Sequence, residues 1–139
     1  MRNKFLLLSV CAASLSTSGL RAQDLPDEFY SPTTKTPTEL KIGSNDRKLL
    51  FSILRKETDG KVKFAGSLKT CKNWAFFGGR TVNPDGSSHV IVDDNGNDDA
   101  CALWLHTAKG WKLVDFSFGH SDAFYLIWPQ QYGAAKELF

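Results

Sequence analysis

The chain has 139 residues, a hydrophobic fraction of 42% and a formal net charge of +2. A chain of this length forms about one domain, and its hydrophobic fraction excludes a wholly disordered protein. Three of the 17 Lys and Arg residues, and no acidic residue, lie in residues 1–22. The remainder therefore has 14 basic against 15 acidic residues, which leaves no overall positive field to attract nucleic acid.

Residues 1–22 predict a secretory signal peptide. Arg2 and Lys4 precede the apolar run Phe5–Ala13, and small residues then lead to Ala22. A positive start, an apolar centre and a small-residue end are typical of a signal peptide, here cleaved after Ala22. The apolar run is too short to cross a bilayer, which needs roughly 20 residues. We therefore expect a periplasmic or extracellular protein with no membrane span.

A surface arm over residues 23–43 and a helix over residues 45–57 come next. The arm has three prolines among threonines, a composition that favours extended chain. Ser44 is a suitable N-cap for the helix, and Asp46 lies in its first turn, where the dipole favours an anion. An apolar stripe then follows one face of the helix: Leu49, Leu50, Ile53 and Leu54. This stripe predicts that the helix covers one face of a sheet.

Five segments predict an antiparallel meander: residues 61–70, 74–79, 89–93, 101–107 and 111–117. The first alternates apolar with polar side chains, which indicates one solvated face. The last two are apolar on both faces and are joined by a turn that contains glycine, so we expect a central hairpin covered on both sides.

A short helix over residues 123–128 is expected after the hairpin, capped by Ser121 or Asp122 and ended by Pro129. Residues 44–139 therefore predict a single α+β domain. In this domain one helix packs on a curved antiparallel meander of four to five strands, and the short C-terminal helix completes the fold.

Cys71 and Cys101 predict one disulfide in an oxidising compartment. The disulfide would close a loop of about 30 residues and stabilise the fold by roughly 3–4 kcal/mol. Cys101 reaches the end of the sheet where Cys71 lies only if residues 89–93 form a strand. The cysteine pair therefore supports the five-strand order. The sequence contains no CxxC motif, which would have indicated a redox site.

Four carboxylates gather between Asp93 and Asp99. The spacing of an EF-hand fails, because the sixth position is Asp98, where glycine is needed, and the twelfth is Trp104, where glutamate is needed. A weak calcium loop and a solvated acidic hairpin tip stay open, and we favour the tip. The histidines are scattered singly at positions 89, 106 and 120, so we expect no metal site and no cofactor.

Two groups of residues are candidates for function. Trp128, at the end of the last predicted helix, and Tyr132, just after it, are the aromatic residues that we expect to face a protein partner. His106, Asp115 and Asp122 would form a general acid–base set if they converged in an apolar pocket. His120-Ser121-Asp122 has the residue types of a catalytic triad, but neighbours in sequence point in different directions, and we predict no catalytic residue.

The pattern from Arg47 onward resembles a group of small secreted bacterial proteins of no established function. The segments that carry the resemblance are RKLLFSILR, FAGSLKTCKNWAFF, ALWLHTAKGWKLVDF and FGHSDAFYLIWPQQYGAAKELF. A helix followed by a meander with such a hairpin is also similar to cystatin-like and nuclear-transport-factor-like (ketosteroid-isomerase-like) α+β folds. The resemblance implies a fold of that type and transfers no catalytic motif.

From these features we expect a non-catalytic binding module that associates with an envelope protein or inhibits a hydrolase. The alternative is a small-molecule pocket or an isomerase-like enzyme, with the pocket between helix and sheet. An enclosed cavity lined by His106, Asp115 or Asp122 would favour this alternative.

Overall fold

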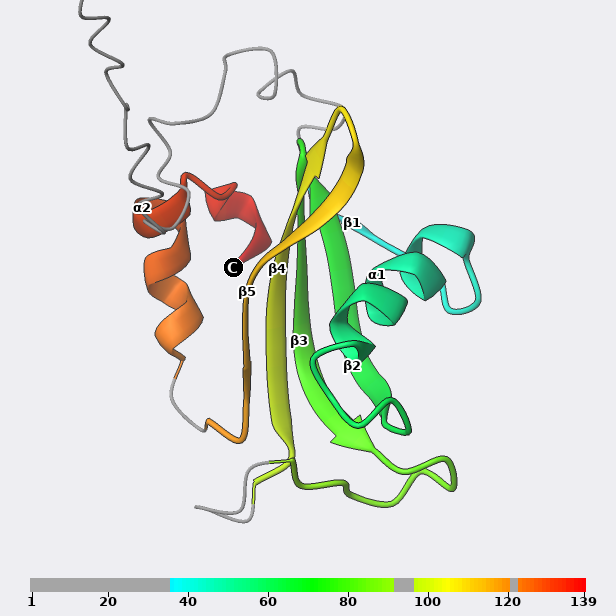
Figure 1. Ribbon diagram of the computed structural model, residues 1–139. Coiled ribbons are helices and arrows are strands. Elements are labelled where there is room, and N and C mark those ends of the chain that lie inside the picture. Colours follow the sequence, from blue (N-terminus) through cyan, green and yellow to red (C-terminus); the bar gives the residue numbers. More distant parts are fainter. Residues whose placement is uncertain (1–35, 92–96, 121–122) are drawn as a thin grey trace, which may run out of the picture.

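A computed structural model describes residues 36–91, 97–120 and 123–139 of the chain. The signal peptide and most of the arm, predicted for residues 1–22 and 23–43, lie outside these ranges. The elements, in chain order, are β1 (Thr38–Glu39), α1 (Asn45–Arg55), β2 (Lys63–Cys71), β3 (Trp74–Val82), β4 (Asp99–Thr107), β5 (Gly110–Phe118), the 3-10 helix η3 (Phe124–Ile127), α2 (Trp128–Tyr132) and the 3-10 helix η4 (Lys136–Leu138). Figure 1 shows the sheet between α1 on one side and α2 on the other.

The sheet has five strands in the order β1-β2-β3-β4-β5, and every neighbouring pair is antiparallel. This confirms the predicted α+β class. The strand membership differs, however, because β1 lies within the predicted arm and residues 89–91 form no strand. β3 pairs directly with β4 from Trp74↔Leu105 to Arg80↔Asp99, so no strand fits between them. Residues 92 and 93, the rest of that predicted strand, lie outside the described ranges.

One face of the sheet is covered by α1. Ser44 caps this helix, and its side chain accepts a hydrogen bond from the backbone N–H of Arg47 at 3.3 Å, as predicted. The helix ends at Arg55, two residues earlier than expected. Its buried apolar side chains are Leu50, Phe51 and Leu54. The buried face of α1 is therefore rotated slightly about the helix axis from the predicted one. Phe51 is buried, whereas Leu49, which was predicted to be buried, is 48% exposed.

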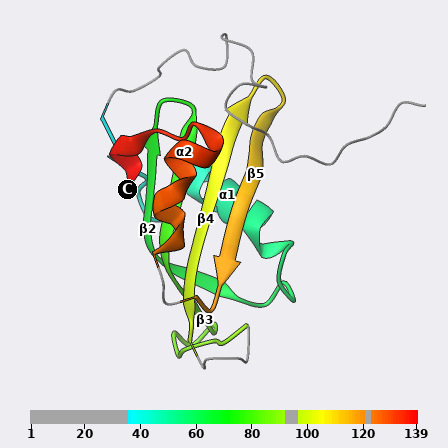
Figure 2. The same cartoon turned by 90° about the vertical axis from the view of Figure 1, so that its left-hand side faces the viewer.

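The C-terminal segment covers the opposite face, as Figure 2 shows. Here η3 runs directly into α2, and Pro129 lies at the start of α2. The prediction that Pro129 ends a helix is wrong, since proline lacks only an N–H that the first helical turn leaves unpaired anyway. Gly133 ends α2 in the left-handed conformation at φ 72°, where glycine is not strained.

β5 contains a β-bulge at Val114, between Leu113 and Asp115. Leu103 pairs with Asp115 and the next residue, Trp104, pairs with Leu113, so Val114 has no partner of its own. β5 therefore has one more residue than β4 over this stretch, as in a β-bulge. As a result Val114 and Asp115, although adjacent in sequence, both face the C-terminal side of the sheet, whereas Leu113 packs on the α1 side.

Two glycines bring β2 and β3 unusually close together. Gly66 and Gly79 are cross-strand partners. A Cβ on Gly79 would lie 2.2 Å from the carbonyl oxygen of Ala65 and 2.8 Å from the Cα of Gly66, closer than any side chain can approach backbone. Glycine inside a strand commonly marks such an approach, and only glycine fits here.

The arginines of α1 protect the outer edge of β2. Arg47 donates to the carbonyl oxygen of Gly66 at 2.7 Å, and Arg55 donates to that of Val62 at 2.9 Å. Arg47 also donates to the carbonyl oxygen of Leu40 at 3.1 Å, which holds the chain after β1 against the helix. The arginine side chains thus occupy carbonyls that an open edge would offer to another strand.

The predicted disulfide between Cys71 and Cys101 is not formed in the structure. Cys71 lies opposite Trp74, which lies opposite Leu105, whereas Cys101 lies opposite Gly78. The two cysteines are therefore two strands and four residue steps apart, roughly 16 Å, where a disulfide needs Cα atoms within about 7 Å. The disulfide was predicted from the cysteine pair and the compartment, and it would need a strand at residues 89–93 that β3 and β4 leave no room for.

Among the residues that the structure describes, no helix is both long enough and apolar enough to cross a bilayer.

Candidate functional site

The residues of the predicted acid–base pocket do not converge. His106 extends the α1-side positions of β4, which alternate through Ala102 and Trp104, and it is exposed. Asp115 lies beyond the bulge and reaches the C-terminal segment on the opposite face. Asp122 lies outside the described residues. The two residues that can be placed are separated by the sheet, so the pocket predicted from His106 and Asp115 is wrong.

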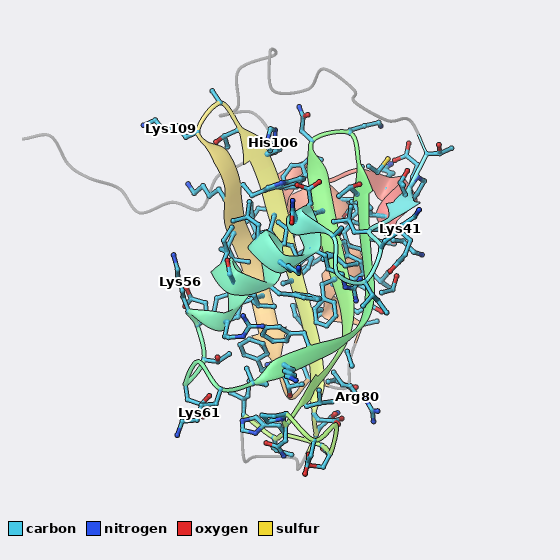
Figure 3. The ribbon with its side chains drawn as sticks, turned by 90° about the vertical axis from the view of Figure 1, so that its right-hand side faces the viewer. Lys41, Lys56, Lys61, Arg80, His106 and Lys109 are labelled. Carbon is cyan, nitrogen blue, oxygen red and sulfur yellow. The ribbon has the colours of Figure 1, made fainter. Side chains whose placement is uncertain are left out.

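His106 lies at the turn end of the β4–β5 hairpin, beside Lys109 in Figure 3. Its ring meets that of its cross-strand partner Trp111 edge to face, with 4.9 Å between the ring centroids. This is the geometry of a packed cross-strand pair. Among the described residues, no acidic side chain forms a hydrogen bond or an ion pair with His106.

Asp115 fastens the C-terminal segment to β5. One carboxylate oxygen accepts a hydrogen bond from the hydroxyl of Tyr132 at 2.8 Å, and the other accepts one from the backbone N–H of Phe116 at 2.8 Å. Burial, together with the hydrogen bond to Asp115, raises the pKa of Tyr132 to about 12. Tyr132 is thus a neutral donor engaged within the molecule.

The predicted partner surface is wrong for Trp128, which is only 1% exposed. Its ring packs among the aromatic rings of Phe76, Phe124 and Phe139, at centroid distances of 6.1, 5.6 and 6.4 Å. The exposed apolar side chains of this segment are instead Leu126 and Ile127, at 58% and 55%. Because η3 turns Trp128 inward, the two residues before it project outward.

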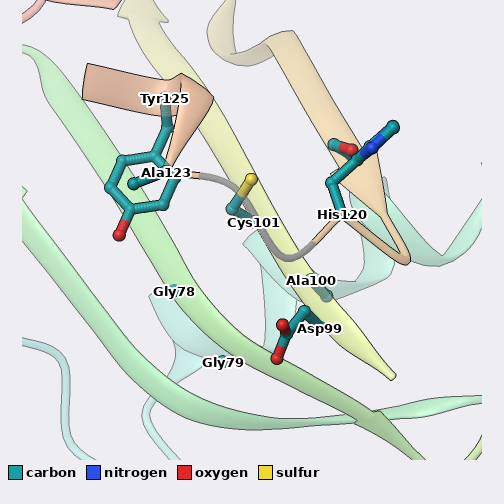
Figure 4. A pocket seen from close by; sticks show the side chains of 9 residues that line it. Gly78, Gly79, Asp99, Ala100, Cys101, His120, Ala123 and Tyr125 are labelled. Carbon is teal, nitrogen blue, oxygen red and sulfur yellow. The ribbon is translucent and has the colours of Figure 1, made fainter. Parts of the chain in front are cut away.

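A cleft of about 230 Å³ lies on the same face of the sheet, beside the C-terminal segment. Its floor follows one cross-strand row, Gly78↔Cys101↔Ser117. Tyr125 and His120 line it on either side of Cys101, and Asp99 lies toward one end, as Figure 4 shows. The cleft exists because the floor side chains are small and because larger residues fill the neighbouring row, Phe76↔Leu103.

The thiol of Cys101 is not a prepared nucleophile. Burial, together with the negative charges of Asp115 and Asp99, raises its pKa to about 12, although a hydrogen bond from the backbone of Ser117 acts in the opposite direction. A reactive cysteine needs the opposite, an electropositive site that favours the thiolate. His120 is exposed and meets Phe124 edge to face, with 5.7 Å between the ring centroids.

Within residues 36–91, 97–120 and 123–139, no group of three His, Cys, Asp or Glu side chains is arranged to hold a metal ion. Much of the acidic segment Asp93–Asp99 lies outside these ranges. At its described end, Asn97 donates from its amide to the carboxylate of Asp99 at 2.9 Å. The choice between a calcium loop and a solvated tip therefore stays a prediction.

Two features of the sequence point to the cleft, and neither was used when the partner surface was predicted. Gly78-Gly79 inside a strand indicates a place where side chains are missing from the sheet. Cys101 and Ser117 are small residues, whereas the neighbouring position on the same face of β4 is Leu103. Their alignment with Gly78 depends on the strand register, which the sequence pattern alone does not define.

Comparison of the chain with protein-family models, with curated proteins and with solved structures finds no match in any of the three. The similarity to cystatin-like and nuclear-transport-factor-like folds therefore remains a prediction. The geometry described above has to carry the functional argument.

Proposed function

We propose that the protein is a secreted, non-catalytic binding module whose partner is another protein of the cell envelope or the extracellular space. The observation that carries this proposal is the outward-facing pair Leu126 and Ile127, both more than half exposed. Large apolar side chains that lie adjacent and exposed are suited to form the centre of a surface that another molecule covers.

The surroundings of this pair favour a protein partner over a lipid surface. Residues 123–135 contain no charged side chain. Interface cores are depleted in charge and enriched in aromatic residues, whereas binding to anionic lipid requires Lys or Arg beside the apolar face. The exposed amides of Gln130 and Gln131 supply the uncharged polar rim that protein interfaces commonly have.

The C-terminal segment that carries Leu126 and Ile127 is held on the sheet by buried side chains and by one hydrogen bond. Trp128 is buried, Leu138 packs in the same cluster, and Tyr132 donates its hydrogen bond to Asp115. A surface fixed in this way loses little conformational freedom when a partner binds, which favours affinity. The module thus presents a preorganised apolar pair on a rigid scaffold.

Site-specific photocrosslinking tests this proposal. A photoreactive residue at position 126 should give one discrete heterologous product in the native envelope, and Ile127→Asp should abolish that product. Leu49 is a matched control site, because it is 48% exposed but lies on α1, on the other side of the sheet. Equal crosslinking from positions 49 and 126, or a product made only of two copies of this chain, would contradict the proposal.

Export is tested separately. The exported chain should begin at Gln23, which intact-mass measurement of the purified protein detects. A mature protein that retains residues 1–22 would contradict signal-peptide cleavage while leaving the binding surface open to its own test.

A further inference from the structure

A second function is indicated by the cleft on the floor row Gly78↔Cys101↔Ser117. This cleft is separate from the apolar pair Leu126 and Ile127, which do not line it. Its floor has room because Gly78 has no side chain and because the cover formed by the C-terminal segment begins only at its rim, with Ala123 and Tyr125.

The charge in and around the cleft is negative. Among the described residues that line it, Asp99 carries the charge. Asp115 lies on the same face one row away, and Arg80, the cross-strand partner of Asp99, is the one described cation in the neighbouring register positions. The negative charges of both carboxylates raise the pKa of the Cys101 thiol, because they disfavour the negatively charged thiolate. The thiol therefore stays neutral, and the cleft attracts cations and repels anions.

The carboxylate of Asp99 still has hydrogen-bonding capacity. Its one described side-chain partner is the amide of Asn97, and a carboxylate accepts up to about four hydrogen bonds. Arg80 is its cross-strand partner on β3, but among the described residues the two form no ion pair. Figure 3 shows Arg80 at the far end of the sheet from His106.

The other groups in the lining suit an organic ammonium ion. Ser117 offers a hydroxyl acceptor, and Tyr125 offers an aromatic ring. Aromatic rings attract ammonium groups through their negative faces, and a carboxylate beside them strengthens the attraction. A strongly hydrated metal ion would instead require several oxygen ligands, which this cleft does not gather.

An open groove adjoins the cleft and shares Ser117 and His120 with it. Its remaining lining residues are Phe116 and Phe124, and its volume is about 390 Å³. The cleft alone is smaller than most ligand pockets, which hold about 300–1,000 Å³. Together, the two spaces accommodate a ligand with a charged end and an apolar end.

We propose that this cleft binds a small organic amine as its ammonium ion, with the charged end beside Asp99 and Tyr125 and the apolar end in the groove of Phe116 and Phe124. The binding needs no reaction and no change in the thiol of Cys101.

The test uses 2-phenylethylamine, which is a cation at neutral pH, and the purified, isotopically labelled exported protein. We expect saturable NMR shifts at the amides of Gly78, Cys101 and Ser117. With one ion pair and few contacts, the dissociation constant should be on the order of 1 mM. The uncharged isostere 2-phenylethanol should bind at least about fivefold more weakly, because it lacks the charge that Asp99 recognises.

Charge variants at neighbouring positions make the test specific. Asp99→Asn should weaken binding at least about fivefold, since the charge-assisted hydrogen bond is lost. Asp98→Asn is the matched control: it removes the same charge one residue away, does not line the cleft, and should leave affinity within about twofold. Arg80→Gln should tighten binding, because it removes a competing cation.

A substitution in the floor of the cleft provides an independent test if the charge variants do not fold. In Gly78→Ala the new methyl group would lie 3.2 Å from Cε1 of Phe76, so a small ring movement accommodates it. This variant should retain the spectrum of a folded protein and lose affinity, because the floor is raised. Equal binding of amine and alcohol, equal loss in the Asp98 and Asp99 variants, or no saturable shift at about 20 mM amine would overturn the proposal.

Discussion

Substitution of Arg47 tests what holds α1 and β1 against the sheet. The residue is 7% exposed, and its guanidinium donates to the carbonyl oxygens of Gly66 at 2.7 Å and Leu40 at 3.1 Å. Its ion pair with Glu39 is longer, at 3.5 Å, and Glu39 is half-exposed. From these distances we infer that the fork of the guanidinium on two carbonyls contributes more than the ion pair.

Arg47→Lys keeps the charge but removes the fork. One well-placed hydrogen bond from a charged donor contributes about 1.5–3 kcal/mol, and lysine is expected to replace only part of the pair. We therefore expect Arg47→Lys to lower the free energy of unfolding by about 2 kcal/mol, or the melting temperature by roughly 10 °C. Glu39→Gln keeps an acceptor for the Leu68 N–H and should cost less than about 1 kcal/mol.

Chemical denaturation of the single and double variants measures both quantities. The coupling between positions 39 and 47 should be no more than about 0.5 kcal/mol, as expected for a half-exposed pair. A lysine variant within about 0.5 kcal/mol of the wild type, combined with a larger loss for Glu39→Gln, would refute the reasoning. In that case the ion pair, and not the carbonyl fork, would hold the helix.

The low-pH behaviour of Glu39 gives an independent check on the same contact. Burial alone would raise its pKa, but hydrogen bonds from Ser67 and Leu68 and the charge of Arg47 lower it below 4.5. The ionised form is thus favoured by folding, so its contribution is full above pH 4.5 and is lost as the pH falls through the lowered pKa. The difference in free energy of unfolding between wild type and Glu39→Gln should shrink as the pH falls through the lowered pKa of Glu39.

Three further predictions concern packing and titration. Leu54→Ala should cost about 2–5 kcal/mol in thermal or chemical unfolding, and the half-exposed Leu49→Ala less than about 0.5 kcal/mol; equal losses would contradict the observed helix face. Gly79→Ala should prevent folding or cost several times more than Gly78→Ala, which meets only a side chain; similar melting temperatures would contradict the close approach of β2. Folding raises the pKa of Tyr132 from 10.0 to about 12, so its contribution is full below pH 10 and is lost as the pH rises through 12; Tyr132→Phe should flatten the fall in stability over this window, and an unchanged slope would contradict the hydrogen bond to Asp115.

The alternation of side chains predicted much of this fold. Trp74 and Phe76 pack on one face of β3, and Ala75 and Phe77 on the other, as the period of two requires. The two-sided hydrophobicity of residues 101–107 and 111–117 predicted a central hairpin with a cover on each face. Both covers are present and β4 is an inner strand, but the prediction is wrong for β5, which lies at the edge of the sheet. These features are local, because a strand's pattern and its environment are set by the same residues.

The errors came from features that depend on pairing between distant segments. An apolar run at residues 89–93 is suitable for a strand, but β3 and β4 already occupy each other's edges. The expected disulfide would require that strand, because only then would Cys101 reach the end of the sheet where Cys71 lies. The bulge at Val114 has no sequence signal of its own, yet it moves Asp115 to the C-terminal side of the sheet and away from His106.

The bulge also links the two proposed binding regions. By turning Asp115 toward the C-terminal segment, it provides the acceptor that Tyr132 needs, and this hydrogen bond helps to hold the segment that carries Leu126 and Ile127. The same carboxylate adds to the negative charge beside Cys101 in the cleft. Asp115→Asn would keep an acceptor for Tyr132 but remove that charge. It should therefore weaken amine binding modestly while leaving the crosslink at position 126 intact, whereas loss of both would show that the two regions depend on Asp115 mainly through folding.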